Sequence, residues 1–362
     1  MTYTVAGANV FGQWFTEENL FPYFHKVSLS GDNLKLNFSR IRLVDANWAY
    51  NIFQIDNDYY VSGAWRGQEY QLIKVEFPEE CKNVNETDIV VAGNDYELIF
   101  VSKKMRILWV MEFDKEEIKK FNFTSDIPPE PEPENVVKKL RKEDVIVKTV
   151  TNNNTYLFLS SEGNVYSGVP PVQLDTRHCM GKVCDIQSGY EHCVLLTDEG
   201  RVYTWGNGRR LQLGHGDISN LESPAQLEAL AGIGIIKISA GGWHSLALSE
   251  FGDLYAWGWN DTAQLGIKSQ SPKSYSVPTL VDFFDENGEE VSLNVKDIAC
   301  GSKHSAVLLE DGTIWTTGLN KYGQLGFPPE MEPVVNCFKK SFQCSKNIKL
   351  KCGPWSTIVI NK

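Results

Sequence analysis

The chain has 362 residues and a net charge of −11, from 46 acidic and 35 basic side chains. This excess of acid argues against direct binding of nucleic acid, which would call for a basic stripe on the surface. No apolar run approaches the roughly 18 residues of a membrane-spanning helix, and no signal-peptide pattern opens the chain, so we expect neither a membrane span nor secretion.

The first 15 residues predict half of a repeating unit whose other half lies at the far end of the chain. Tyr3–Gly7 has the pattern of a strand, and Gln13 follows Gly7 by 6 residues. The same spacing recurs in the middle of the chain, and an incomplete copy of that repeat begins at Cys352. Because the two fragments fit one register, we expect Met1–Phe15 to complete the last sheet and remove its exposed edge.

Between residues 16 and 168 the repeat is recognisable only by register. Thr16–Arg40 does not fit it, and we expect a long connection into the first complete unit. Three weak copies follow, namely Val44–Gly63 with Ala46 in the place of an opening glycine and Asn57 at the turn, Val90–Val110 with Gly93 at the opening, and Thr151–Gly168 with Gly163 at the turn.

Three strong copies lie between Ser188 and Gly326, with opening glycines at Gly189, Gly241 and Gly301. A turn glycine follows each after 11 residues, another glycine after 6 more, and the glutamine of a Gln-Leu-Gly ending after a further 6. Each copy predicts a β-hairpin, after which the glutamine amide bonds the loop backbone. Repeats that start 52 and 60 residues apart predict a propeller or an array rather than a compact enzyme core.

Two segments interrupt the repeats and are predicted to be inserted loops. Residues 124–144 combine prolines and acids with the basic run Lys138–Lys142, and residues 267–294 hold an acidic stretch. Long loops cost little stability, so a tolerated surface insertion and a partner-docking loop both remain open.

A histidine follows each opening glycine by three residues, and each histidine precedes a small residue. Because His192, His244 and His304 recur at one repeat position, we expect a structural hydrogen bond between neighbouring units rather than a catalytic or metal site. His178, Cys179 and Cys184 lack a fourth ligand at finger-like spacing, so we predict no metal. The eight cysteines form no CxxC pair, which favours reduced, buried thiols.

No catalytic or cofactor motif occurs in the sequence. There is no Gly-x-Ser-x-Gly elbow, phosphate-binding loop, dinucleotide fingerprint or HExxH. The sequence therefore predicts a protein that is not an enzyme and binds no cofactor.

The repeated motif resembles that of the regulator of chromosome condensation repeat family, whose members are seven-bladed β-propellers. The resemblance is specific over Ser188–Gly326. It implies an all-β fold in which residues 1–362 form a single seven-bladed propeller, closed by an N-terminal strand pair that joins the C-terminal blade.

Tryptophans are the candidate partner-binding residues. In the expected register, Trp48, Trp243 and Trp355 lie two residues after the blade-opening position, which places Trp355 beside Trp48 at one mouth of the central channel. Of Trp257 and Trp259, one is expected to face the core and one a loop, and Trp259 is counted among the candidate partner-binding residues. Exposed tryptophans there could anchor a partner, because this residue is enriched at interface hot spots. The alternative is that they plug the channel as packing.

The resemblance extends to a small single-propeller group of the family, through AGGWHSLALSEFGDLYAWGWN and the final CGPWST. It implies a non-enzymatic adaptor that binds a Jumonji-C oxygenase and supports chromatin regulation and chromosome segregation. One copy of the chain is expected to form a heterodimer with this partner. The implied location is the nucleus, with the cytoplasm as the alternative. The acidic charge makes a histone or other basic protein a second candidate partner. Guanine nucleotide exchange on a small nuclear GTPase is the alternative function, although no wedge-like hairpin or basic N-terminal tail is recognisable.

Overall fold

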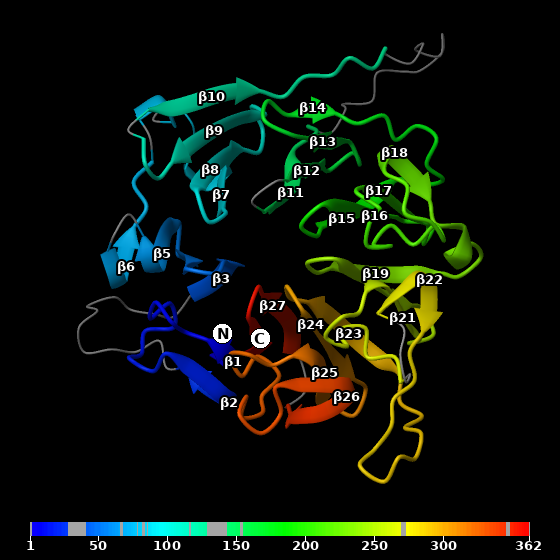
Figure 1. The fold of residues 1–362 in the computed structure, drawn as a ribbon. Coiled ribbons are helices and arrows are strands. Elements are labelled where there is room, and N and C mark those ends of the chain that lie inside the picture. The colour runs from blue at the N-terminus through cyan, green and yellow to red at the C-terminus, as the bar shows by residue number, and fades with distance from the viewer. Residues whose placement is uncertain are drawn as a thin grey trace.

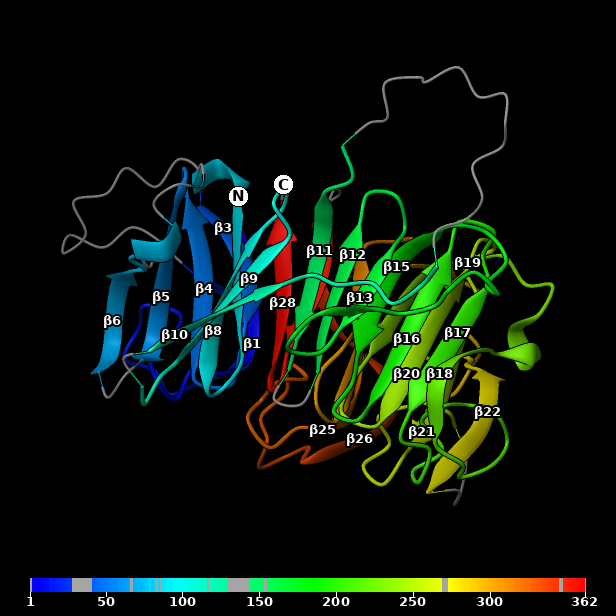
Figure 2. The same ribbon diagram turned by 90° about the horizontal axis from the view of Figure 1, so that it is seen from above.

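Seven four-stranded antiparallel sheets surround a central channel in the computed structural model (Figure 1). The structure describes residues 2–27, 41–65, 68–77, 79–81, 84, 86–115, 117–128, 143–152, 155–268, 273–344 and 348–361. Each sheet is one blade, so the prediction of an all-β, seven-bladed propeller is confirmed. Figure 2 shows the ring from the side, with the strands of the blades running between its two faces.

Blades one to three contain the weak copies of the repeat, and each copy is a hairpin as predicted. From the channel outward, blade one holds β3 (Ile41–Ala46), β4 (Tyr50–Ile55), β5 (Asp58–Trp65) and β6 (Gln68–Lys74). Blade two holds β7 (Ile89–Gly93), β8 (Glu97–Ser102), β9 (Ile107–Glu112) and β10 (Ile118–Asn122). Blade three holds β11 (Ile146–Thr151), β12 (Tyr156–Ser160), β13 (Val165–Ser167) and β14 (Val172–Gln173).

Blades four to six contain the strong copies. Blade four holds β15 (Val183–Ser188), β16 (His192–Thr197), β17 (Val202–Gly206) and β18 (Leu221–Gln226). Blade five holds β19 (Ile235–Ala240), β20 (His244–Ser249), β21 (Leu254–Trp259) and β22 (Ser274–Leu280). Blade six holds β23 (Val295–Cys300), β24 (His304–Leu309), β25 (Thr313–Leu319) and β26 (Val334–Gln343).

Helical structure in the described part of the chain is limited to three short 3₁₀ turns, η1 (Glu79–Cys81), η2 (Glu86–Asp88) and η3 (Glu228–Leu230). Within the same residues, no helix has the length and apolar character needed to cross a membrane.

The hydrophobic core lies between neighbouring blades rather than within one. The second strands of the strong copies, β16, β20 and β24, are buried at every position. Leu246 and Leu248 of blade five pack with Val307 and Trp315 of blade six in one cluster. Because a single sheet cannot bury both of its faces, each blade depends on its two neighbours.

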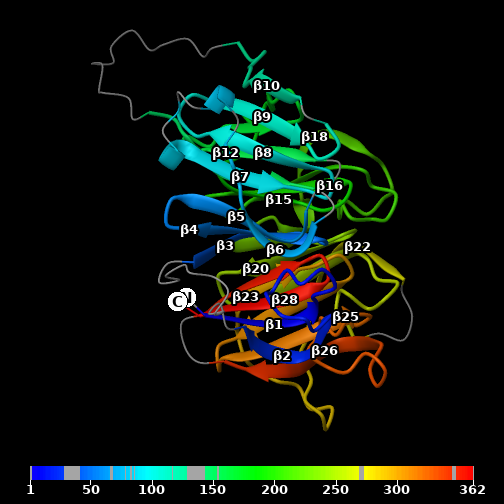
Figure 3. The same cartoon turned by 90° about the vertical axis from the view of Figure 1, so that its left-hand side faces the viewer.

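The N-terminus completes blade seven, whose strand order is β2-β1-β28-β27. Strand β1 (Thr2–Ala8) pairs with β28 (Ser356–Asn361), and β28 pairs with β27 (Ile348–Gly353). The two chain ends lie together in Figure 3. The predicted closure of the ring is therefore confirmed.

The outermost strand of blade seven corrects one prediction. Thr16–Arg40 was expected to be a connection, but Leu20–Val27 forms β2 and pairs with β1. The rest of that segment, residues 28–40, lies outside the described residues.

The two predicted inserted loops differ in outcome. The segment 267–294 contains β22, the outer strand of blade five. The prediction of an inserted loop is therefore wrong for Ser274–Leu280. Val281 and Phe283 are also buried, in the core cluster shared with blade six. In the other segment, residues 129–142, with the basic run Lys138–Lys142, lie outside the described residues.

Gly7→Ala is expected to lower the free energy of unfolding by about 3 kcal/mol or more. Gly7 has a φ of +117°, and an added Cβ would lie 2.3 Å from the backbone oxygen of Trp355. Trp355 directly precedes β28, and Gly7 pairs with Ser356, the first residue of that strand, so relief requires β1 to move away from β28. Urea unfolding measures the change. Gly288→Ala is the control, because that residue also has a positive φ, +82°, but no neighbour within 4 Å. A Gly7 variant as stable as the Gly288 variant would contradict the prediction.

Candidate functional site at the mouth of the central channel

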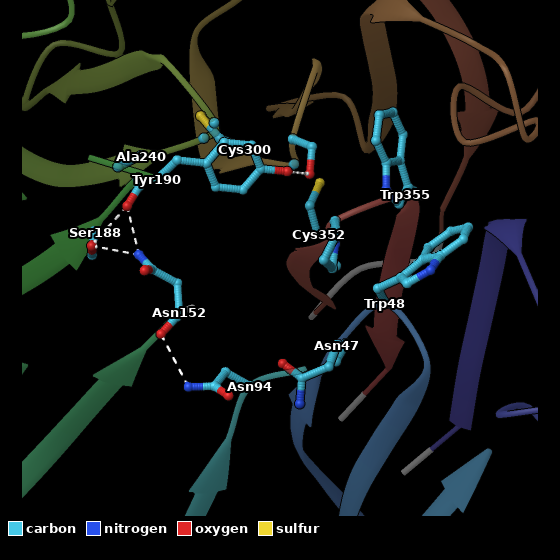
Figure 4. A pocket seen from close by; sticks show the side chains of 18 of the residues that line it. Asn47, Trp48, Asn94, Asn152, Ser188, Tyr190, Ala240, Cys300, Cys352 and Trp355 are labelled. Carbon is cyan, nitrogen blue, oxygen red and sulfur yellow. Dashed lines mark hydrogen bonds between the residues drawn. The ribbon is translucent and has the colours of Figure 1, made fainter. Parts of the chain in front are cut away.

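The seven inner strands end at one face of the ring, which we call the channel-mouth face. In six blades, the residue after the inner strand donates its N–H to the carbonyl three positions later, the donors being Asn47, Asn94, Asn152, Gly189, Gly241 and Gly301. Gly353 ends the seventh inner strand. A cavity of about 350 Å³ opens between these strand ends (Figure 4).

This pattern corrects the register of the first two blades. Ala46 and Gly93 were expected in the place of the opening glycine, but both are the last residues of inner strands, and Asn47 and Asn94 take that place. At Gly189 an added Cβ would lie 2.3 Å from the carbonyl oxygen of Gly241, so the blades approach closely there.

Asparagine side chains link blades two, three and four. The amide of Asn94 donates to the carbonyl of Asn152 at 3.2 Å, and the amide of Asn152 donates to the carbonyl of Gly189 at 2.5 Å (Figure 4). An asparagine side chain thus carries the inter-blade contact that the backbone makes directly among the glycine blades.

Trp48 and Trp355 lie together at the seam between blades one and seven, as predicted, with ring centroids 6.3 Å apart (Figure 4). Tyr322 lies 5.2 Å from Trp48 and 5.5 Å from Trp355, and Phe11 lies 5.9 Å from Trp48. All four are half-buried, and we call them the seam cluster. The two tryptophans are not equivalent in register, since Trp48 follows Asn47 directly whereas Trp355 follows Gly353 by two residues.

Trp243 and Trp259 belong to a second group on the same face, together with Arg210 and Tyr190. The guanidinium carbon of Arg210 lies 4.2 Å from the ring centroid of Trp243 and 4.7 Å from that of Trp259. The ring of Tyr190 is 5.1 Å from that of Trp243. Of Trp257 and Trp259, Trp257 is the core residue: it is fully buried and donates its Nε1–H to the carbonyl of Gln212 at 2.9 Å.

The same loop position supplies a residue to both groups. As predicted, the Gln side chains bond the loop backbone, each accepting the N–H of the residue two positions earlier, in the pairs Phe11–Gln13, Arg210–Gln212, Thr262–Gln264 and Tyr322–Gln324. Three of these residues contact a mouth tryptophan of the following blade, in the pairs Phe11–Trp48, Arg210–Trp243 and Tyr322–Trp355. Arg210 therefore takes a place that an aromatic ring takes in two other blades.

Tyr190, rather than a tryptophan, reaches across the mouth. Its hydroxyl donates to the Oγ of Ser302, from blade four to blade six, at 2.5 Å (Figure 4). The ring passes over Gly242 of blade five, where an added Cβ would lie 3.1 Å away. Sequence reasoning did not single out Tyr190, because the same position is Gly242 and Ser302 in the next two copies.

Below the mouth, the channel wall carries ion pairs between neighbouring inner strands. Lys148 pairs with Asp185, Lys237 with Asp297, and Lys351 with Asp45. Lys349 lies among these lysines, and burial, together with the charges of Lys237 and Lys351, lowers its pKa. These pairs fasten the inner strands to one another.

Two of the three histidines link neighbouring blades, as predicted. His192 Nε2 lies 2.8 Å from the Oγ of Ser245, and His244 Nε2 lies 3.0 Å from the Oγ of Ser305. His304 is equally buried, but neither of its ring nitrogens has a hydrogen-bond partner among the described residues. Burial lowers the pKa of His192 and His244 to about 3 and that of His304 to about 4.

The remaining candidate ligands have ordinary structural contacts. His178 Nε2 lies 2.7 Å from the carbonyl oxygen of Pro224, and the thiol of Cys184 donates to the carbonyl of Leu196. All eight cysteines are free thiols, but only four of them are buried, since Cys337, Cys344 and Cys352 are partly exposed and Cys184 is exposed. Burial raises the pKa of Cys193 and Cys300 to about 12, which makes both poor nucleophiles.

Comparison with known proteins agrees with the repeat pattern. Two family models described as the regulator of chromosome condensation (RCC1) repeat match the chain, one at residues 199–248 and 252–308, the other at residues 183–212, 235–264 and 295–324. RCC1 domain-containing protein 1 of Mus musculus is 34% identical over 209 residues, which cover 49% of this chain and 55% of that protein. The match thus spans about half the length of this relative.

Solved structures show the same fold over the whole ring. Human WBSCR16 superposes with a TM-score of 0.74 at 16% identity, over 100% of both chains. Prp20p of Saccharomyces cerevisiae, whose structure was described with its binding properties to Gsp1p and histones, gives a TM-score of 0.72 at 18% identity, over 100% of this chain and 92% of that chain.

Proposed function

From the finding that the chain carries regulator of chromosome condensation repeats in a closed seven-bladed propeller, we propose that it is a non-enzymatic adaptor that docks a partner protein on the channel-mouth face. The proposed partner is a Jumonji-C oxygenase acting on chromatin, and the proposed location is the nucleus. Both follow from the resemblance to the single-propeller group, and the similarity to RCC1 domain-containing protein 1 supports them.

The seam cluster is the observation that carries the docking proposal. Four half-buried aromatic side chains meet where the first and last blades join, and each comes from a different loop. Interface hot spots are enriched in such large, rigid side chains. The closed ring holds them in place before binding, so little ordering entropy is lost on association.

Replacement of both Trp48 and Trp355 by alanine is expected to weaken partner binding by about thirtyfold or more, the effect of losing a hot spot. The chain is immobilised, incubated with nuclear extract, and the bound proteins are identified by mass spectrometry. A Jumonji-C protein should be recovered by the wild type, and its affinity for each variant is then measured with purified components.

Phe251→Ala is the matched control, because Phe251 is 71% exposed in the turn between β20 and β21, away from the channel mouth. It should leave partner binding unchanged. The double variant should keep a melting temperature close to that of the wild type. A large fall in melting temperature would assign Trp48 and Trp355 to packing instead.

Guanine nucleotide exchange is the second candidate function, favoured by the fold match to Prp20p, a protein described as binding Gsp1p. The test adds the purified chain to a small nuclear GTPase loaded with a fluorescent guanine nucleotide. On the adaptor proposal, nucleotide release keeps its intrinsic rate. Accelerated release, with no Jumonji-C protein recovered, would favour exchange.

A further inference from the structure

Arg210 is held in an unusual way for a surface cation. Its guanidinium group contacts two indole rings, with 4.2 Å to the ring centroid of Trp243 and 4.7 Å to that of Trp259. The loop is fixed as well, since the backbone N–H of Arg210 donates to the side chain of Gln212 at 2.8 Å. Cation–π contact with two rings restricts the orientation of the guanidinium before any ligand arrives.

The guanidinium of Arg210 has no acidic partner within the part of the chain that the structure describes. Arg106 and Arg177, in contrast, each form an ion pair, with Asp144 and Asp175. The carboxylate of Glu191 accepts the Nε1–H of Trp243, one of the two rings that contact Arg210, at 3.4 Å. Arg210 is half-buried, and its five N–H donors lack a carboxylate acceptor.

We propose that Arg210 is a preformed receptor for a carboxylate group of a docking protein, so that the partner presents an Asp or Glu side chain to this point of the channel-mouth face. A guanidinium fork matches a carboxylate with two parallel N–H···O bonds, so an Asp or Glu side chain suits this group. The inference rests on the proposed function, because it deepens the docking proposal for the same face.

The local charge favours a carboxylate over other ligands. The net charge of −11 suggested basic partners for the surface as a whole, but a basic side chain would be repelled by Arg210. The neighbouring Glu191 and the ion pair of Asp261 with Lys303 keep the surroundings from being strongly positive. A group with one negative charge is therefore accommodated more readily than a doubly charged phosphate.

The test uses the full chain and labelled hexapeptides of glutamate, glutamine, lysine and phosphoserine, with affinities measured by fluorescence anisotropy at low salt. The glutamate peptide should bind, and Arg210→Gln should weaken it about tenfold, the effect of losing a charged hydrogen-bonded pair. Arg210→Lys should lose most of the same affinity, because lysine keeps the charge but not the fork.

Arg209→Gln is the matched control. Arg209 is the adjacent residue and is exposed, and its replacement removes the same charge from the same loop. Equal losses in the two Gln variants would reduce the effect to net charge and overturn the proposal. Tighter binding of the lysine or the phosphoserine peptide would overturn it too. If Arg210→Gln leaves glutamate binding intact while the Trp48 and Trp355 variant loses the Jumonji-C protein, the proposed function stands and this inference fails.

Discussion

Removal of residues 1–27 is expected to prevent the chain from folding as a stable monomer. The truncation takes β1 and β2 from blade seven and leaves β28 as an unpaired edge. It also removes Tyr3, Val5, Trp14 and Phe21, each at most 1% exposed in the core between blades seven and one. Burial of four such side chains contributes roughly 6–12 kcal/mol, which is comparable to the whole stability of a typical domain.

Circular dichroism and size-exclusion chromatography measure the outcome, and a synthetic peptide of residues 1–27 provides the rescue. The truncated chain should show a lost or lowered unfolding transition and self-association through the open edge. Added peptide should restore a monomer with the wild-type transition. Deletion of residues 286–289, in an exposed turn, is the control and should leave the transition in place. A monomeric truncated chain with wild-type stability would show that closure by the N-terminus is not needed.

The sequence predicted the closure because the repeat has fixed spacing. Gln13 makes the same hydrogen bond in its loop as Gln212 and Gln324 do in theirs, and that local chemistry can be recognised wherever the segment lies. The outer strands carry no comparable signal. Strands β2 and β22 are exposed at several positions and pair on one side only, so their side chains follow no repeated pattern.

The register of the first two blades failed for a different reason. Glycine occupies the channel mouth where backbones touch, but asparagine takes that position in blades one and two, as Asn47 and Asn94. The Asn94 side chain bonds the next blade, whereas the Nδ2 of Asn47 has no hydrogen-bond partner among the described residues. The contact between Trp48 and Trp355 was still predicted correctly, because blades seven and one are neighbours whichever residue opens them.

Arg210 was missed, although its position two residues before Gln212 matches those of Phe11 and Tyr322. Aligning that loop position across the copies could have identified it.

The stability of the folded chain is expected to fall steeply as the pH drops from 6.5 toward 4. His192, His244 and His304 are fully buried, and burial lowers their pKa values to about 3, about 3 and about 4. Below pH 6.5 the unfolded chain binds a proton at each histidine while the folded chain does not, so protonation favours unfolding. The stabilisation from the three neutral histidines is fully present above pH 6.5 and is lost as the pH falls below it. When unfolding takes up three protons, the free energy of unfolding falls by about 4 kcal/mol per pH unit.

Urea unfolding at pH 7.5 and at pH 5 measures this loss. The variant His244→Gln removes one of the three titrating histidines and so measures the contribution of a single proton. The variant should lose about 2 kcal/mol less than the wild type between the two pH values, because one titrating group is gone. Ser305→Ala is the control. Ser305 donates its hydroxyl proton to the carbonyl of Gln264, so it accepts from His244 Nε2, and its removal leaves that N–H without a partner. Because this variant removes no titrating group, it should lower stability equally at both pH values, by about 1–3 kcal/mol. Unchanged wild-type stability between pH 7.5 and 5 would mean that the three histidines do not stay neutral inside the ring.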